Sequence, residues 1–100
     1  MKNERDFLDE MIAEHSKDPE FAKAWAESQA RINIASLRKE LNLTQAQVAE
    51  RMGVARPRVA ELERRPLSVS FGRMSAYARA LGVSLARIDQ AVHAEIAGSQ

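Results

Sequence analysis

The chain has 100 residues, a length that suits one domain with a single modest hydrophobic core. Its composition is 45% hydrophobic, with many alanine, leucine, glutamate and arginine residues and only 5% aromatic residues, which favours helices over strands. Cysteine is absent and no apolar stretch reaches membrane-spanning length, so we expect a cytoplasmic protein without a disulfide framework, a thiolate zinc site or a membrane span.

The net charge of +1 is divided unevenly along the chain. Residues 1–30 contain four Lys or Arg and eight Asp or Glu, a net −4, whereas residues 31–100 contain eleven and six, a net +5. An acidic segment before a basic one indicates that the basic part binds a polyanion and that the acidic part binds something else. The alternative is an accidental scatter of charge in a small protein.

The acidic segment predicts two helices. Residues 4–15 have an amphipathic pattern, and Asp18 followed by Pro19 is typical of the start of a second helix, which extends toward Leu41. Six large apolar side chains form the expected partner-binding set: Phe7, Leu8, Met11, Ile12, Phe21 and Trp25. They pack either on the domain's own core, an alternative that is strong for Trp25, or on another subunit or protein, because so short a first helix is marginal alone.

Later helices follow from caps and apolar spacing. Thr44 and Gln47 match a capping box that starts a helix ending at Gly53. A helix near residues 70–81 is expected to bury four apolar side chains, Phe71, Met74, Ala78 and Leu81. A last helix begins after Ser84 and places three apolar side chains on one face, Leu85, Ile88 and Val92. This last set either forms a dimer interface or packs in the core.

Residues 43–65, LTQAQVAERMGVARPRVAELERR, carry the most informative pattern. One short helix, a glycine turn and a second short helix make a helix-turn-helix, whose second helix enters the major groove of double-stranded DNA. Ala49 is expected where the two helices cross, since a larger side chain would force them apart, and Gly53 permits the sharp turn. Val59 and Leu62 are expected to hold the second helix on the core.

Over about residues 34–83 the sequence resembles the Cro/C1-type (XRE-like) helix-turn-helix repressors. The matching motifs are Leu37-Arg38, Leu43-Thr44-Gln45, Val48-Ala49, Met52-Gly53-Val54, Val59, Leu62-Glu63 and Ala80-Leu81-Gly82-Val83. The resemblance implies that Gln45 binds a phosphate at the start of its helix. It also implies that Arg56, Pro57 and Glu61 face bases, with Arg58 near bases or phosphate.

The chemistry of these side chains agrees with that assignment. Arg56 and Arg58 can each donate two hydrogen bonds to a guanine, and Glu61 can accept a hydrogen bond from the amino group of a cytosine. This chemistry predicts a half-site that contains G·C pairs. Four side chains, Arg38, Gln45, Arg64 and Arg65, are better suited to phosphate. The full expected DNA-binding set is Arg38, Thr44, Gln45, Ala55, Arg56, Pro57, Arg58, Glu61, Arg64 and Arg65. The alternative is a solvated helix face on which Glu61 pairs with Arg58 or Arg65.

Pro57 departs from the polar residue that is usual in the reading helix. Its side chain cannot donate a hydrogen bond to a base, although it can touch a thymine methyl. It also biases Arg56 away from helical angles, which allows the reading helix to start one residue later.

A second resemblance joins the two parts of the chain. The acidic segment with Asp18-Pro19-Glu20-Phe21, followed by Leu37-Arg38 and Leu43-Thr44-Gln45, resembles the antitoxins of HigA type. That resemblance implies a repressor of its own operon that also neutralises a RelE/HigB-like ribonuclease toxin, a small basic protein. An acidic arm suits the surface of such a partner.

The sequence therefore predicts an all-α protein, a five-helix Cro/C1-type helix-turn-helix domain over residues 31–97 preceded by an acidic amphipathic helical arm over residues 1–30. We expect a homodimer on a palindromic operator, with no cofactor, no metal and no enzymatic activity, because no catalytic motif is present. Two alternatives remain open: a phage or plasmid repressor without a toxin partner, and a protein-interaction module on the same scaffold.

Overall fold

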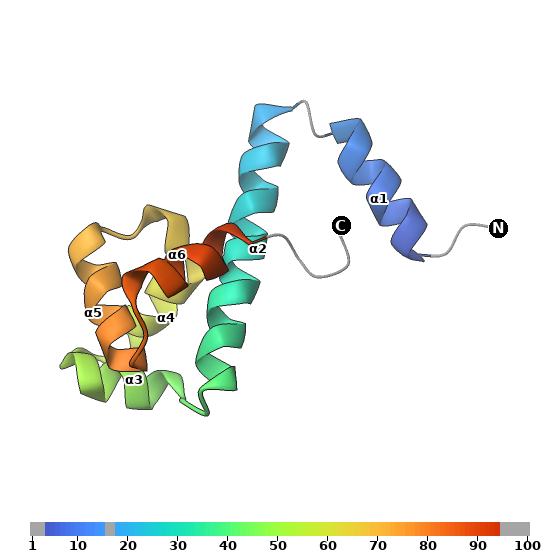
Figure 1. Ribbon diagram of the computed structural model, residues 1–100. Coiled ribbons are helices and arrows are strands. Elements are labelled where there is room, and N and C mark those ends of the chain that lie inside the picture. The colour runs from blue at the N-terminus through green and yellow to red at the C-terminus, as the bar shows by residue number, and fades with distance from the viewer. Residues whose placement is uncertain (1–3, 16–17, 95–100) are drawn as a thin grey trace.

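The computed structural model describes residues 4–15 and 18–94, which form helices joined by short turns (Figure 1). The elements are α1 (Glu4–His15), α2 (Pro19–Glu40), α3 (Gln45–Met52), α4 (Arg56–Arg64), the short 3₁₀ helix η1 (Pro66–Ser68), α5 (Phe71–Leu81) and α6 (Leu85–His93). The predicted all-α fold is confirmed: five helices, α2 to α6, build the domain, and α1 precedes them as a helical arm.

Local signals set the ends of the helices as predicted. The Thr44 hydroxyl accepts a hydrogen bond from the Gln47 N–H (3.1 Å), and the Gln47 side chain accepts one from the Thr44 N–H (2.8 Å), so the capping box before α3 is complete. Helices α3 and α5 end at Gly53 and Gly82, whose φ angles of 70° and 79° lie in the left-handed region. A side chain is strained in that region, so glycine suits both turns.

The core lies where α2 to α6 meet. Each of these helices contributes one of the most deeply buried side chains: Ile34, Val48, Val59, Tyr77 and Ile88. Because α3 and α4 each place a fully buried valine in this core, the helix-turn-helix is fixed rigidly to the rest of the domain.

The structure favours one of the two alternatives for α6 and corrects one expectation for α5. Ile88 and Val92 are buried in the chain's own core and Leu85 is half-buried against it, so core packing rather than a dimer interface explains their apolar spacing. Phe71 was expected to be buried, but its side chain is 76% exposed. It is the first residue of α5, and the buried face of that helix begins one turn later, at Met74.

Helix α2 extends past the core at its N-terminal end (Figure 1). It runs unbroken for 22 residues, and the predicted boundary between residues 30 and 31 lies inside it. Trp25 and Ile34 are nine residues apart, about two and a half turns, so they lie on opposite sides of α2. Since Ile34 faces the core, Trp25 faces away from it; core packing of Trp25 is therefore wrong.

Candidate nucleic-acid interface

The second helix of the helix-turn-helix, α4, separates its side chains cleanly into two faces. Val59 and Leu62 are buried against the core, as predicted. The seven DNA-binding candidates on and beside this helix are all exposed: Ala55, Arg56, Pro57, Arg58, Glu61, Arg64 and Arg65. Helix α4 and the residue that follows it therefore present four arginines and one glutamate to solvent.

The start of α4 accommodates the unusual proline. The helix begins at Arg56, so Pro57 is its second residue, where a missing N–H removes no hydrogen bond within the helix. Ala55 precedes the helix in an extended conformation, and its carbonyl accepts a hydrogen bond from the Arg58 N–H at 2.9 Å. The reading helix thus starts at Arg56 and not one residue later.

The charged side chains on this face are not engaged with one another. Within residues 18–94 Glu61 forms an ion pair with neither Arg58 nor Arg65, and the guanidinium groups of Arg56 and Arg58 form no ion pair there. These groups lie in water, where a phosphate or a base edge has access to them. The arrangement suits an anionic ligand better than a self-neutralised helix face.

An open hollow lies between α4 and the start of α5, and it adds residues that sequence reasoning missed. Arg58, Glu61 and Arg65 line it from α4 and its C-terminal end, and Ser70 and Arg73 line it from α5. Ser70 caps α5, accepting from the Arg73 N–H at 3.3 Å, so the backbone N–H groups at the start of α5 lie at this hollow. Three guanidinium groups beside a helix N-terminus suit a backbone phosphate. The sequence pattern that could have identified this site is Ser70, a helix cap, followed three residues later by Arg73.

A buried network of four side chains connects the helices behind this face. Glu63 accepts hydrogen bonds from Arg38 Nε (2.6 Å), from the Tyr77 hydroxyl (2.5 Å) and from Gln45 Nε2 (3.1 Å). Arg38 also donates to the backbone carbonyl of Leu43 at 2.8 Å. These contacts join α2, α3, α4 and α5 around one carboxylate.

The protonation of this network follows from its burial. Burial alone would lower the pKa of the Arg38 guanidinium, but the hydrogen bond and the negative charge of Glu63 outweigh it and raise that pKa. Burial, reinforced by the hydrogen bond to Glu63, raises the pKa of the Tyr77 hydroxyl above its usual range. Both groups therefore keep their protons and act as donors to Glu63.

The network corrects one predicted DNA contact and constrains another. Arg38 was expected to bind phosphate, but its residue is 7% exposed and its guanidinium is engaged with Glu63 and Leu43, so its role is structural. Gln45 lies half-buried at the first position of α3, where Glu63 holds its amide. Thr44 is exposed, and its hydroxyl caps α3.

The sequence of these helices matches a known protein family. The family model described as helix-turn-helix matches residues 34–88, from the middle of α2 into α6, which is more than half of the chain. The chain belongs to the helix-turn-helix family. A helix-turn-helix of this kind is a DNA-binding module.

Individual relatives of this helix-turn-helix protein are also detectable. The antitoxin HigA1 of Mycobacterium tuberculosis is 40% identical over 52 residues, both in strain CDC 1551 / Oshkosh and in strain ATCC 25618 / H37Rv. The match covers 52% of this chain and 35% of each relative, so the aligned region is about one third of the relatives' length. No solved structure matches the chain.

The predicted partner-binding residues lie on α1 and near the start of α2, away from α4. Phe7 and Leu8 on α1 are 62% and 41% exposed, and Met11 is half-buried. Phe21 and Trp25 on α2 are half-buried and stack, with ring centroids 6.4 Å apart and planes inclined by 9°. The side chain of Ile12 lies outside the described residues. In Figure 1, α1 lies beyond the N-terminal half of α2, on the opposite side from α3, α4 and α5.

Two other classes of site are absent from the described part of the chain. Residues 4–15 and 18–94 contain no group of three or more His, Cys, Asp or Glu side chains arranged to hold a metal ion. None of the helices there combines the length and the apolarity that a membrane crossing requires.

Proposed function

We propose that this regulator is a homodimeric repressor of antitoxin type, which binds a palindromic operator through α4 and a small basic toxin through its N-terminal arm. The observation that carries the proposal is the separation of two chemically different surfaces. Helix α4, with its exposed arginines, lies together with α3 and α5 on one side of α2, and α1 lies on the other side (Figure 1). A protein with both surfaces free has room to hold DNA and a protein partner together.

The DNA half of the proposal assigns a role to each exposed group on α4. Arg56 and Arg58 pair with guanine and Glu61 accepts from cytosine, while Pro57 contacts a thymine methyl. Phosphates lie against Arg64, against the amide of Gln45, and in the hollow that Arg65 and Arg73 line. A second copy reads a second half-site about one helical turn away, since a single reading helix covers too few base pairs for useful specificity.

The toxin half rests on the chemistry of α1 and of the outer side of α2. Four carboxylates on α1 are exposed, Asp6, Asp9, Glu10 and Glu14. Phe7 and Leu8 are exposed beside them, and two large exposed apolar side chains are uncommon on a helix that does not pack in the core. Acidic groups around apolar anchors suit a basic protein that otherwise grips RNA, because the charges steer the encounter and the apolar side chains hold the complex. The match to relatives named antitoxin supports this half.

Co-expression tests the two halves together. The regulator is produced with the product of any neighbouring reading frame that encodes a small basic protein, and the complex is applied to DNA selected from a random pool. The proposal predicts that the basic protein co-purifies, that its ribonuclease activity is lost in the complex, and that the complex binds the selected DNA. DNA binding without any such partner would contradict the antitoxin assignment and favour a repressor that acts alone.

A further inference from the structure

Helix α2 carries an aromatic face on the side that points away from the core, formed by Phe21, Trp25 and the adjoining Ser28. These residues follow one another at intervals of four and three residues, which is one side of a helix. The charged residues between positions 21 and 36 share the other side, at four-residue intervals: Lys23, Glu27 and Arg31. A helix side in water usually carries charge, so an uncharged side with two aromatic rings marks a surface that associates.

Helix α1 has a matching apolar side. Phe7, Leu8 and Met11 lie together on it, and Phe7 and Leu8 are 62% and 41% exposed. A helix of 12 residues is marginal in water on its own, and no described side chain of α1 belongs to the core. In Figure 1, α1 and α2 diverge from their connected ends, so α1 does not lie along the aromatic face in this arrangement.

We propose that α1 closes onto the aromatic face of α2 as a lid, and that the lid masks these side chains in the free protein. The proposal rests on the proposed function, in which the same side chains bind a basic protein, because that partner must then open the lid to reach them. What it adds is a regulation of that site: the arm exists in a closed form and an open form, and the partner selects the open one.

The lengths of the two helices fit this closure. Three residues separate α1 from α2, which is within the range of connections that join two antiparallel helices. Counted equally from the connected ends, Met11 is level with the turn between Phe21 and Trp25. By the same count Leu8 is level with the turn between Trp25 and Ser28. The apolar side of α1 therefore meets the aromatic face over its whole length.

The charges on α1 fit the closure as well. Asp6 and Asp9 lie on the side of α1 away from Leu8 and Met11, and both are exposed. Closure therefore buries apolar groups without burying these carboxylates, and the aromatic face brings no charged group against them. The carboxylates stay in water, where they attract a basic partner while the lid is shut.

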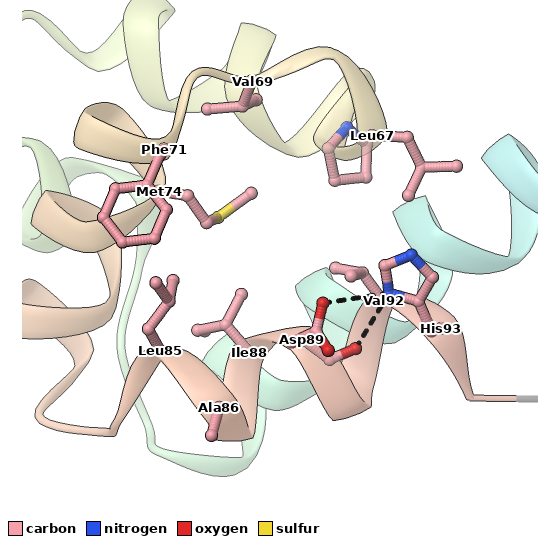
Figure 2. A pocket seen from close by; sticks show the side chains of 11 residues that line it. Leu67, Val69, Phe71, Met74, Leu85, Ala86, Ile88, Asp89, Val92 and His93 are labelled. Carbon is pink, nitrogen blue, oxygen red and sulfur yellow. Dashed lines mark hydrogen bonds and ion pairs between the residues drawn. The ribbon is translucent and has the colours of Figure 1, made fainter.

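The other apolar recess of the domain lies on the opposite side of α2. It is the groove between η1, the start of α5 and α6, where Leu67 and Phe71 are exposed (Figure 2). The core residues Ile88 and Val92 form part of its wall, so the groove lies on the side of α2 that carries the core, whereas Trp25 faces away. Position 67 therefore distinguishes a lid in the groove from a lid on the aromatic face.

Disulfide formation tests the closure, since the chain contains no cysteine of its own. Leu8→Cys combined with Ser28→Cys (L8C/S28C) brings two thiols together only when α1 closes. The matched control is D9C/S28C, because Asp9 adjoins Leu8 but lies on the other side of α1. In a buffer of reduced and oxidised glutathione, the effective concentration of the two thiols should be about tenfold or more higher in L8C/S28C than in D9C/S28C.

Trp25 gives a second readout, because it is the single tryptophan of the chain. Replacing Phe7 and Leu8 by serine opens the lid, so we expect the emission of Trp25 to shift to longer wavelength. Ile32→Ser is the control: Ile32 is exposed on the same side of α2, but by the count above it lies beyond the start of α1. We expect I32S to leave the emission unchanged, and unchanged emission in F7S/L8S would overturn the closure.

Three disulfide results would overturn the closure: equal effective concentrations in L8C/S28C and D9C/S28C, a bond between two copies instead of within one chain, or a stronger pairing in L8C/L67C, which would place α1 in the groove. The masking is tested with the small basic protein from the neighbouring reading frame. Reduced L8C/S28C should bind it at least about tenfold more tightly than the oxidised form, and equal binding would overturn the masking. A wild type that binds no such protein, while L8C/S28C pairs as expected, would refute the proposed function and leave the closure intact.

Discussion

The Glu63 carboxylate on α4 accepts a hydrogen bond from Arg38 Nε on α2 at 2.6 Å, and both residues are buried. This pair fixes the reading helix to the long helix that carries the arm. A buried carboxylate is costly unless its lone pairs are satisfied, and here the Tyr77 hydroxyl and the Gln45 amide complete the set of donors.

Removal of Glu63 should therefore destabilise the domain strongly. Glu63→Ala leaves the Arg38 guanidinium buried without its counter-ion, and we expect the free energy of unfolding to fall by about 3–5 kcal/mol. Glu61→Ala is the matched control: it removes the same group two residues away, but from the exposed face, and should change stability by less than about 0.5 kcal/mol. Urea denaturation of both variants gives the comparison, and equal effects would contradict the buried pair.

The same network predicts a loss of stability at alkaline pH. Burial and the bond to Glu63 raise the pKa of the Tyr77 hydroxyl in the folded state, whereas an unfolded tyrosine titrates near pH 10. Its contribution to stability is thus fully present below about pH 10 and is lost as the pH rises further, because the unfolded state then releases a proton that the folded state retains.

Tyr77 is the single tyrosine of the chain, so tyrosinate absorbance reports on it alone. We expect this signal to appear together with unfolding and not before it, and we expect Tyr77→Phe to reduce the alkaline loss. At neutral pH, Y77F should cost about 1–2 kcal/mol for the missing donor. Titration of the folded protein near pH 10 would show that the hydroxyl is not held as described.

Salt dependence distinguishes phosphate contacts from base contacts. Arg73→Ala removes one guanidinium from the hollow between α4 and α5, and the slope of log K against log salt should become shallower by about 0.9. The loss should be similar for every operator sequence, since phosphates carry no sequence information. Arg31→Ala on α2 removes the same charge away from the hollow and should leave the slope unchanged. A sequence-dependent effect of R73A would instead indicate base contact.

The arm should be separable from DNA binding. Replacing both Phe7 and Leu8 by serine removes exposed apolar surface, so we expect the affinity for the proposed toxin partner, measured by calorimetry, to fall at least about tenfold. Operator affinity and the melting temperature should not change, because neither side chain belongs to the core. A parallel loss of DNA binding would mean that the arm supports the helix-turn-helix directly.

Local patterns in the sequence were sufficient to predict much of this fold. The box formed by Thr44 and Gln47, and the turns at Gly53 and Gly82, depend on neighbouring residues only, and the structure reproduces them. The outward face of α4 followed from helical spacing once Val59 and Leu62 were placed inside.

The roles of the remaining residues depend on tertiary contacts, which no local sequence pattern reveals. Arg38 looked like a phosphate ligand because its acceptor, Glu63, lies 25 residues later and no local pattern joins the two. Tyr77 was not singled out, since a tyrosine is buried only where its hydroxyl finds a partner, and that partner is the same Glu63. Phe71 fits the apolar spacing of α5, but the helix begins at this residue and the core does not reach it.

The central claim is that the outer face of α4 reads DNA, and substitution of Arg58 tests it most directly. Fluorescence anisotropy on the selected operator should show that Arg58→Ala weakens specific binding by about 1–3 kcal/mol and relaxes the preference at one G·C pair. The control R31A should bind as the wild type does, and R58A should melt as the wild type does, because the side chain is exposed. Unchanged operator affinity in a folded, dimeric R58A would contradict the account.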